Sequence, residues 1–444
     1  MATTSVCTED ALAFEEASTD VVSTDVEDTS SIDTKEVARE DECDSGAAVS
    51  RFRTGVIITN AVLGTSPLAL PYAMQQSGWA LLAFLILFSV ALSFTLWLTG
   101  HVLGLVDARA AELGIPRLRR DWSTVGQLTF GRWGFIVVAG FVLVDLYTCV
   151  LSTLVLAGDN LHLVFAVLPT ERCIVVLGLL LFFLALVPER FLDRFAIVGI
   201  LSFWLIIVSI VLTGGELLFF GEAADDQIQV HWQGLSAGMG VVLWLFFVHS
   251  EAPLIYQMME DRSQWHVSVA LGMSGASLIV LVVAVCGYAF FGGACQESIT
   301  DNLGRNLDLQ LLPGASNAII SGSAALFLTV KLMTSVPLQM APIIGFMEEQ
   351  LGIQEGFLQV CLKAMFVAIT TAICLHLGKH FATILEVSAP LVQAPVCTIF
   401  PCAAFLKLKT DLGLCKRSLL WVTILVAAVY AVVGTAASIY EAIE

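Results

Sequence analysis

The residues of this chain that could do chemistry are ionisable side chains inside long apolar segments. His249, Ser250 and Glu251 form the densest group, directly ahead of Pro253. A charge near the middle of a bilayer costs at least ~3 kcal/mol, so these side chains are expected to face a cavity or a partner. An imidazole, a hydroxyl and a carboxylate at one point suit a proton or the polar groups of a small solute. We therefore predict that all three line a binding site.

A second group, on another apolar segment, combines a lysine with two hydroxyls. Thr334 and Ser335 follow Lys331 by three and four positions, which places the three side chains on one face of a helix. That face is predicted to point inward, because the lysine lies too deep in its segment to snorkel to the surface. Asp145 lies near the middle of a third segment, where it is expected to pair with Lys331, to bind a substrate amine or to carry a proton.

Other chemistries lack the residues that they need. No spacing of His and Cys matches a zinc site, and no glycine-rich loop could cradle the phosphates of ATP. His249 and Glu251 have no nucleophile or metal partner, so an intramembrane enzyme is a remote alternative. We expect neither an enzyme nor a cofactor.

The composition indicates a membrane protein with many spans. Hydrophobic residues make up 57% of the chain and charged residues 14%, and the mean hydropathy is +0.85. About eleven apolar runs approach the ~20 residues that cross a bilayer. The spans are predicted near residues 54–74, 79–103, 133–157, 172–188, 195–220, 235–257, 267–291, 317–343, 357–376, 381–406 and 418–441.

The first 50 residues differ from the rest of the chain. They carry 14 acidic residues against two basic ones, and so hold most of the net charge of −18. With almost no aromatic residues, they cannot bury enough apolar surface to fold alone. We predict a disordered acidic tail over residues 1–50 and a transmembrane domain over residues 51–444. No nucleic acid is expected as a partner.

The basic residues orient the chain in the membrane. With a cytoplasmic N-terminus, fourteen Lys and Arg residues fall on the cytoplasmic side and three on the opposite side. Because basic residues concentrate in cytoplasmic loops, the N-terminus is predicted to be cytoplasmic. Cys173 and Cys295 both fall near the opposite face, where they could form a disulfide if that face is oxidising.

The first predicted span is interrupted in its middle. Gly64 and Pro67 lie there, with Pro71 one turn later, and a proline removes a backbone donor and clashes with the preceding turn. In hydrocarbon the freed backbone groups must face protein or a wet cavity. We therefore predict that Gly64, Thr65 and Ser66 line the binding site. A simple proline kink in a structural helix is the alternative.

The sixth predicted span carries a second interruption, at the group of residues 249–251. With spans one and six broken, the first ten spans divide into two sets of five that enter from opposite sides, as in inverted-repeat transporters. The helix ends at each break offer amide donors to an anion and carbonyl oxygens to a cation, which suits a zwitterion. The predicted fold is an all-α polytopic bundle of five plus five spans and one more.

Several short motifs occur in a specific joint order. They are Gly64 with Leu70-Pro71-Tyr72-Ala73 and Gly78-Trp79; Val125-Gly126-Gln127 with Phe130-Gly131; Asp145-Leu146-Tyr147; Gly158-Asp159-Asn160-Leu161; His249 with Pro253; Gly287-Tyr288 with Phe291-Gly292; and Lys331 ahead of Pro337 and Pro342. Through these motifs the chain resembles the amino acid/auxin permease family, and within it the branch of vacuolar and vesicular amino acid transporters. The resemblance covers roughly residues 54–441.

The resemblance implies a bundle of eleven helices, of the kind first seen in a bacterial leucine transporter, that moves amino acids by alternating access. In sodium-coupled transporters of that architecture, hydroxyls on the eighth span help to hold the ion, and the ammonium of Lys331 would compete with it. We therefore assign Lys331, Thr334, Ser335 and Glu251 to a coupling-ion site that favours a proton over sodium. Ser66 and Glu251 replace a glycine and an apolar residue that are usual in the family, and both changes touch the pocket.

The residues and the resemblance together predict a secondary active amino acid transporter, proton-coupled by preference. Its expected partners are an amino acid, a proton and the lipid bilayer, and its expected address is a vacuolar membrane or another endomembrane, with the plasma membrane as the alternative. A membrane amino acid sensor that signals through the acidic tail is the rival from another class. A sodium-coupled transporter is the rival with the same fold.

Overall fold

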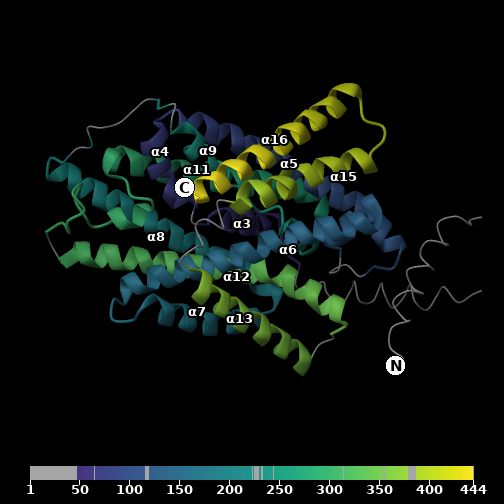
Figure 1. The fold of residues 1–444 in the computed structure, drawn as a ribbon, viewed down its shortest axis with the longest axis horizontal. Coiled ribbons are helices and arrows are strands. Elements are labelled where there is room, and N and C mark those ends of the chain that lie inside the picture. Colours follow the sequence, from purple (N-terminus) through teal and green to yellow (C-terminus); the bar gives the residue numbers. More distant parts are fainter. Residues whose placement is uncertain are drawn as a thin grey trace, which may run out of the picture. The chain divides into compact units, whose positions relative to one another are not determined.

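The structure is a computed structural model in which the chain forms a bundle of helices (Figure 1). Two isolated β-bridges accompany the helices in the described part, Val49 with Met259 and Arg305 with Leu311. The predicted acidic tail, apart from its last three residues, and Thr65 lie outside the described residues. The structure describes residues 48–64, 66–115, 120–222, 224, 230–231, 234–243, 245–313, 315–353, 356–378 and 387–443.

The apolar runs form α-helices, because a helix satisfies its own backbone donors and acceptors where no water is present. The helices are α3 (Arg51–Val62), α4 (Ser66–Ser77), α5 (Leu81–Glu112), α6 (Trp122–Val164), α7 (Thr170–Ala185), α8 (Leu192–Phe219), α9 (Leu235–Leu243), α10 (Ala252–Gln257), α11 (Trp265–Phe291), α12 (Ala315–Leu351), α13 (Phe357–Leu377), α15 (Phe400–Leu408) and α16 (Leu414–Ile443). Short 3-10 turns precede α8 and α11, namely η3 (Glu189–Phe191) and η4 (Arg262–Gln264).

Among the described residues, eight helical segments are long and apolar enough to cross a membrane, and a ninth results if α3 and α4 count as one bent span. The prediction of an all-α, multi-pass membrane protein is thereby confirmed. α7 has 16 residues, and α9 and α10 have 9 and 6, so each is shorter than the usual crossing. The predicted total of eleven spans includes these short helices and stays a prediction.

Both predicted interruptions occur in the structure. α3 ends at Val62 and α4 begins at Ser66, and the two axes differ by 52°. Gly64 lies in the turn between them and donates its N–H to the Val62 carbonyl at 2.8 Å. α9 ends at Leu243 and α10 begins at Ala252. Because α4 packs against α9, the two broken spans lie side by side in the bundle.

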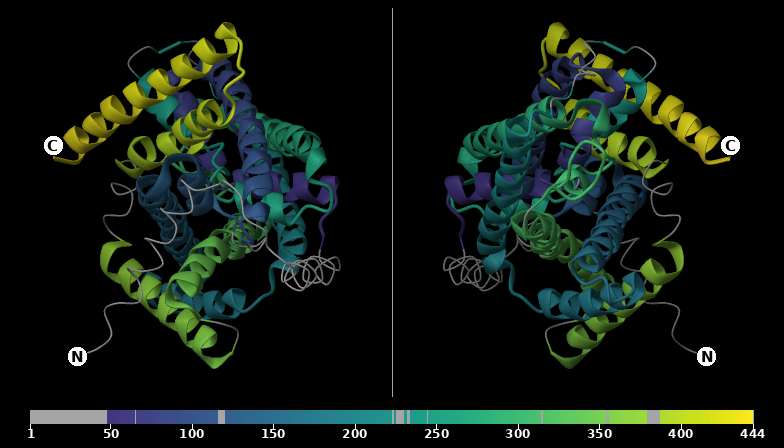
Figure 2. Two further views of the ribbon diagram at one scale, coloured as in Figure 1. Left: turned by 90° about the vertical axis from the view of Figure 1, so that its right-hand side faces the viewer. Right: turned by 90° about the vertical axis from the view of Figure 1, so that its left-hand side faces the viewer.

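Long helices surround the two breaks. α12 packs against α6 and α8, and α3 packs against α11 and α8. Ahead of α15 the chain forms two π-helical segments, η8 (Ala389–Gln393) and η9 (Pro395–Ile399), whose prolines remove backbone donors. α16 packs against η8, η9 and α15, and Figure 2 shows it at the edge of the bundle.

A kink in α6 directs the helix into the bundle. Gly131 has φ 71° and ψ −159°, a conformation that suits glycine because it has no Cβ. The kink separates a short first segment from the long part of α6 that carries Asp145. At the start of the helix, the Asp121 side chain accepts the Thr124 N–H at 3.0 Å and so caps the first turn.

The last residues of the predicted tail are hydrogen-bonded to the rest of the chain. Residues 48–50 were assigned to the acidic tail, yet Val49 donates its N–H to the Met258 carbonyl at 2.9 Å and accepts the Glu260 N–H at 3.0 Å. These bonds join the start of the folded chain to the connection between α10 and α11. They use backbone groups only, which explains why the composition of the tail gave no sign of them.

The predicted disulfide between Cys173 and Cys295 is wrong, since both thiols are free and buried. The Cys173 thiol donates to the Leu168 carbonyl at 3.9 Å, and the Cys295 thiol donates to the Gly287 carbonyl at 3.7 Å. The neighbours of the two segments also differ. α7, which carries Cys173, packs against α6 and α13, whereas the turn beside Cys295 packs against α11 and α4. A shared membrane face is therefore not enough to pair them.

Candidate functional site

A cluster of buried polar side chains lies between α6, the break of span six and α12. Asp145, Ser250, Glu251 and Lys331 make up this central cluster, and each is at most 6% exposed. The Ser250 hydroxyl donates a hydrogen bond to the Asp145 carboxylate. Glu251 interacts electrostatically with both Asp145 and Lys331, and its Oε2 has no hydrogen-bond partner among the described residues. The fold thus brings together four of the residues that the sequence singled out.

Lys331 reaches from α12 to the end of α3 at the first break. Its ammonium donates to the backbone carbonyl of Asn60 at 3.1 Å and to Ser335 Oγ at 2.6 Å. Carbonyls in the last turn of a helix have no helical partner, so they are available to a cation. Among the described residues the ammonium is held by these two neutral oxygens and forms no ion pair with a carboxylate, so the pairing of Lys331 with Asp145 stays a prediction.

Thr334 and Ser335 lie beside the ammonium, on the shared helix face that their spacing predicts. The Thr334 hydroxyl donates to the Lys331 carbonyl at 2.7 Å. α8 closes this side of the site through Gly199. A Cβ on Gly199 would come within 2.2 Å of Asn60 Oδ1 and 2.5 Å of Thr334 Oγ1, so only a residue without a side chain lets the helices approach this closely.

Gly199→Ala is expected to lower the apparent melting temperature and to reduce transport at least tenfold, because the added methyl pushes α8 away from α3 and α12. Gly215→Ala on the same helix is the matched control, since no atom in the described part of the chain lies within 4 Å of its added Cβ. Thermal unfolding and uptake of the two purified variants provide the measurement. Equal behaviour of the two variants would show that close packing at Gly199 is unimportant.

His249 is fully buried, and its ring turns away from the central cluster toward α5. Its Nε2 lies 3.0 Å from the Thr95 hydroxyl, while its Nδ1 has no partner in the described part. The His249 carbonyl accepts the Trp122 indole N–H at 2.7 Å. Because these contacts tie the break of span six to α5 and α6, the ring fixes the position of its neighbour Ser250.

The first break contributes backbone more than side chains. A Cβ on Gly64 would meet no atom of the described residues within 4 Å, so they leave open space against the backbone there. Ser66 begins α4 and is half-buried. Thr65, the third residue predicted at this break, lies outside the described residues.

Three further residues belong to the site but were not singled out in the sequence. Asn60 supplies the carbonyl for Lys331, and Trp122 binds the break of span six. Gln393 is buried in η8, with its amide near the Asp145 carboxylate. Two sequence signals could have identified them: Asn60 is a polar residue inside an apolar span, four positions before Gly64, and Gln393 lies in a span that contains several prolines. Trp122 had no sequence signal, because its partner is a backbone carbonyl.

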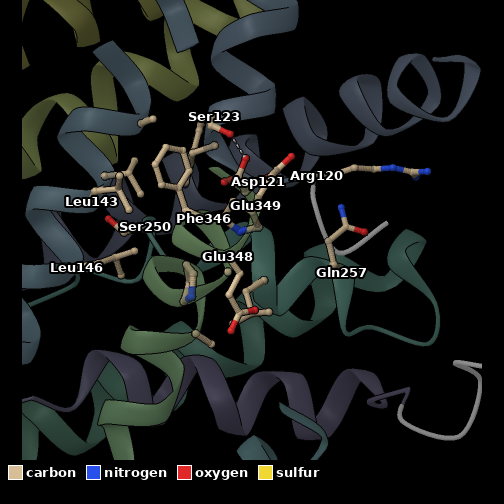
Figure 3. A pocket seen from close by; sticks show the side chains of 18 of the residues that line it. Arg120, Asp121, Ser123, Leu143, Leu146, Ser250, Gln257, Phe346, Glu348 and Glu349 are labelled. Carbon is tan, nitrogen blue, oxygen red and sulfur yellow. Dashed lines mark hydrogen bonds between the residues drawn. The ribbon is translucent and has the colours of Figure 1, made fainter. Parts of the chain in front are cut away.

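A cavity of about 260 Å³ leads from the surface to Ser250 (Figure 3). The start of α6, the turn η3 and the end of α12 form its mouth. Burial raises the pKa of the Asp121 carboxyl at this mouth above its ordinary value. Glu251 does not line the cavity. The lining residues are Arg120, Asp121, Trp122, Ser123, Ala139, Val142, Leu143, Leu146, Glu189, Ser250, Pro253, Leu254, Gln257, Ala341, Pro342, Gly345, Phe346, Glu348, Glu349 and Ile353.

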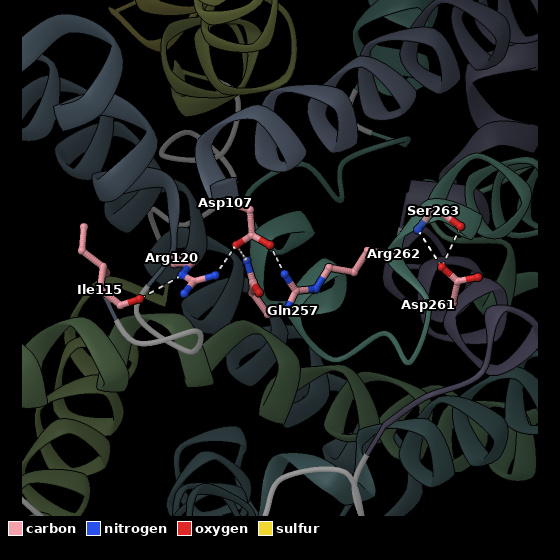
Figure 4. Close-up of polar contacts among 7 residues, drawn as sticks. All are labelled: Asp107, Ile115, Arg120, Gln257, Asp261, Arg262 and Ser263. Atoms are coloured by element: carbon pink, nitrogen blue, oxygen red, sulfur yellow. Dashed lines mark hydrogen bonds and ion pairs between the residues drawn. The ribbon is translucent and has the colours of Figure 1, made fainter. Parts of the chain in front are cut away.

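Asp107 joins the end of α5 to the segments beside this cavity (Figure 4). One carboxylate oxygen accepts from Arg120 at 2.9 Å and from the Gln257 amide at 3.3 Å, and the other is paired with Arg262. Arg120 lies ahead of α6, Gln257 ends α10 and Arg262 starts η4. A single carboxylate therefore holds α10, the second half of span six, against α5 and α6.

Comparison with known proteins identifies the family. The model for the transmembrane amino acid transporter protein family matches residues 48–443. The chain is 25% identical to Amino acid transporter AVT1D of Arabidopsis thaliana over 80% of this chain and 64% of that protein, so it spans less than two thirds of this relative. It is 22% identical to Amino acid transporter AVT1I of the same plant, over 91% of this chain and 96% of that protein.

A relative from another kingdom shows a similar level of identity. The chain is 25% identical to a Danio rerio protein named as a sodium-coupled neutral amino acid transporter, over 84% of this chain and 82% of that protein. The relatives are named as transporters rather than enzymes, which agrees with the prediction that the chain is not an enzyme.

Two solved structures share the fold. A manganese transporter of Eremococcus coleocola has a TM-score of 0.60 at 15% identity, over 94% of this chain and 90% of that chain. MhsT in complex with L-phenylalanine has a TM-score of 0.57 at 12% identity, over 88% of this chain and 99% of that chain. These likenesses confirm the predicted leucine-transporter-like fold. With the family match over nearly its whole folded part, the chain belongs to the transmembrane amino acid transporter family.

Proposed function

We propose that the chain is a secondary active amino acid transporter that works by alternating access and is driven by protons. One observation carries the proposal: the Lys331 ammonium rests on the Asn60 carbonyl and the Ser335 hydroxyl, beside the break of span one. A carbonyl and a hydroxyl are ligands that suit a monovalent cation. Lys331 therefore holds the position that a coupling cation would fill.

Charge balance in the central cluster supports proton coupling. Asp145 and Glu251 are two carboxylates in a dry region, and Lys331 is a single ammonium. Two buried carboxylates cannot both stay ionised unless each has a nearby cation to balance its charge, and one lysine balances only one carboxylate. The second carboxylate binds a proton or meets a positive group on the substrate.

The substrate site in this proposal lies between the two breaks. Open space beside Gly64 leaves room for a substrate carboxylate near the N-terminus of α4, which begins at Ser66. Ser250, at the inner end of the cavity, and its partner Asp145 face the same region, and they offer oxygen atoms to a substrate amine. His249 acts as a positioning residue, because its ring binds Thr95 on α5. Thr65 keeps its predicted role as an expectation.

The cavity and the contacts of Asp107 support alternating access. The cavity reaches Ser250 from one side of the bundle, and α10, which forms part of its wall, is held by Asp107 through Gln257. A half-helix tied to the scaffold by one carboxylate is suited to move between two positions. Asp107 is therefore proposed to hold α10, the second half of span six, in the position seen here.

Asp107→Ala is expected to reduce uptake about tenfold and to destabilise the protein by ~2 kcal/mol, because Arg120 and Arg262 lose the carboxylate that they share. Asp261→Ala is the control, since Asp261 bonds locally to Ser263 in an exposed turn. Uptake and melting temperature are measured for both. Matching values for the two variants would contradict the proposed role of Asp107.

The test of the proposed function is a panel of amino acids on proteoliposomes that carry an imposed pH gradient, repeated with sodium replaced by choline. Proton coupling predicts accumulation that follows the pH gradient and survives the choline replacement. Binding of an amino acid without its movement would contradict transport and favour the sensor.

Sodium coupling is the second candidate, and the name of the Danio rerio relative is the observation that favours it. It predicts uptake that stops in choline and ignores pH. We propose a vacuolar or other endomembrane address on the strength of the family resemblance, with a cytoplasmic N-terminus. Microscopy of the full chain fused to a fluorescent protein tests the address.

A further inference from the structure

A second groove, of about 400 Å³, lies on the side of α5 away from the central cluster. Three segments form it: the middle of α5, the turn from η4 into α11, and the end of α15. Its residues fall into an apolar floor and a basic edge, and no acidic side chain is among them. They are Trp97, Gly100, His101, Gly104, Leu105, Arg262, Ser263, Trp265, His266, Phe405 and Lys409.

The floor is aromatic and is shaped by two glycines of α5. A Cβ on Gly100 would lie 1.9 Å from the Trp265 ring, so the tryptophan packs flat on the helix only because glycine is there. The Trp265 indole N–H donates to the Leu96 carbonyl at 3.1 Å, which holds the ring in place. One turn further along α5, Gly104 also lines the groove.

The basic edge of the groove consists of exposed side chains. His101 and His266 are exposed, and the Nδ1 of each lies near a backbone carbonyl, that of Trp97 at 3.2 Å and that of Ser263 at 3.0 Å. Because a carbonyl only accepts, Nδ1 carries the hydrogen, and Nε2 donates to an anionic oxygen in the protonated ring. Lys409 is also exposed, and its Nζ lies 5.9 Å from the Phe405 ring centre.

The position of the groove matches the level of lipid headgroups. Tryptophan collects where the hydrocarbon meets water, and Trp97 and Trp265 flank the groove. Further exposed basic residues lie nearby in the chain, Lys407 at the end of α15 and Lys416 and Arg417 at the start of α16. Basic pockets between membrane helices recognise anionic headgroups.

We propose that this groove binds an anionic phospholipid, with its phosphate against His101, His266 and Lys409 and the start of its acyl chains over Trp97 and Phe405. The aromatic floor and the basic edge together favour a lipid over a soluble anion. A free phosphate would use the basic edge and leave the aromatic floor bare to water, whereas a phospholipid covers both. The proposal concerns a site apart from the central cluster and does not depend on what the protein transports.

The test measures lipid retention by the full-length purified protein. The protein is delipidated, given phosphatidylglycerol or phosphatidylcholine, and examined by native mass spectrometry. The wild type is expected to retain phosphatidylglycerol at least tenfold better than phosphatidylcholine. The triple variant His101→Gln, His266→Gln, Lys409→Gln is expected to lose this preference, while Arg132→Gln, which removes an exposed charge outside the groove, keeps it.

A second variant separates a seated lipid from diffuse attraction to surface charge. Gly104→Leu adds a large side chain to the lining and keeps every basic residue, and among the described residues the Tyr256 hydroxyl, at 3.2 Å, is the atom near the new Cβ. It is expected to weaken retention of phosphatidylglycerol several-fold, with an unchanged elution volume as the check of folding. Retention unchanged in the triple variant or in Gly104→Leu would overturn the proposal. Displacement of the lipid by millimolar inorganic phosphate would assign the groove to a free anion instead.

Discussion

Lys331→Ala is expected to abolish accumulation of substrate against its gradient while the protein stays folded. A gradient of two pH units can support about 100-fold accumulation at one proton per substrate, because each unit is worth about 1.4 kcal/mol. Without the ammonium on the Asn60 carbonyl and the Ser335 hydroxyl, the pH gradient no longer acts on the break of span one. Inside and outside concentrations should then become equal.

The measurement compares accumulation with exchange in the same proteoliposomes, at zero membrane potential. Exchange of labelled for unlabelled substrate needs no driving ion, so it should persist in Lys331→Ala and show that the protein is folded. Lys363→Ala, on α13, is the control lysine and should behave like the wild type. Wild-type transport that requires sodium and ignores pH would contradict the proposed coupling role of Lys331.

Glu251→Gln is expected to have the second large effect, because it keeps the shape of the side chain and removes its charge. Glu251 is 6% exposed and interacts with Asp145 and Lys331. If Glu251 carries the proton, the variant loses the pH dependence of uptake. If Glu251 meets a positive group on the substrate, the variant loses cationic amino acids at least about tenfold more than neutral ones.

The rival explanation is that Glu251 points into a water-filled vestibule, where its charge matters little. The structure opposes this explanation, since Glu251 is buried and is absent from the lining of the cavity that reaches Ser250. Glu348→Gln is the matched control, because Glu348 does line that cavity. Uptake is measured across pH for a cationic and a neutral amino acid. A Glu251→Gln profile equal to that of the wild type in pH dependence and substrate ranking would decide for the vestibule.

Much of the fold was determined by local sequence features. Long apolar runs have one stable form in lipid, so they specified helices and a multi-pass membrane protein. Glycine and proline act on their own backbone, which is why Gly64 and Pro67 located the first break. Helical spacing also placed Lys331, Thr334 and Ser335 on one face, because that periodicity belongs to a single helix.

The tertiary structure alone decided which faces meet. Periodicity gives the face of a helix but not the helix that lies opposite it, so the sequence could not show that the Lys331 ammonium meets the Asn60 carbonyl of α3. For the same reason the sequence could not show that the His249 ring contacts Thr95 on α5. The contacts of Val49 with Met258 and Glu260 were also not foreseen, because they use backbone groups, which every residue carries. Contacts between distant residues and contacts made by the backbone leave no pattern in one sequence, and in this protein they form much of the site.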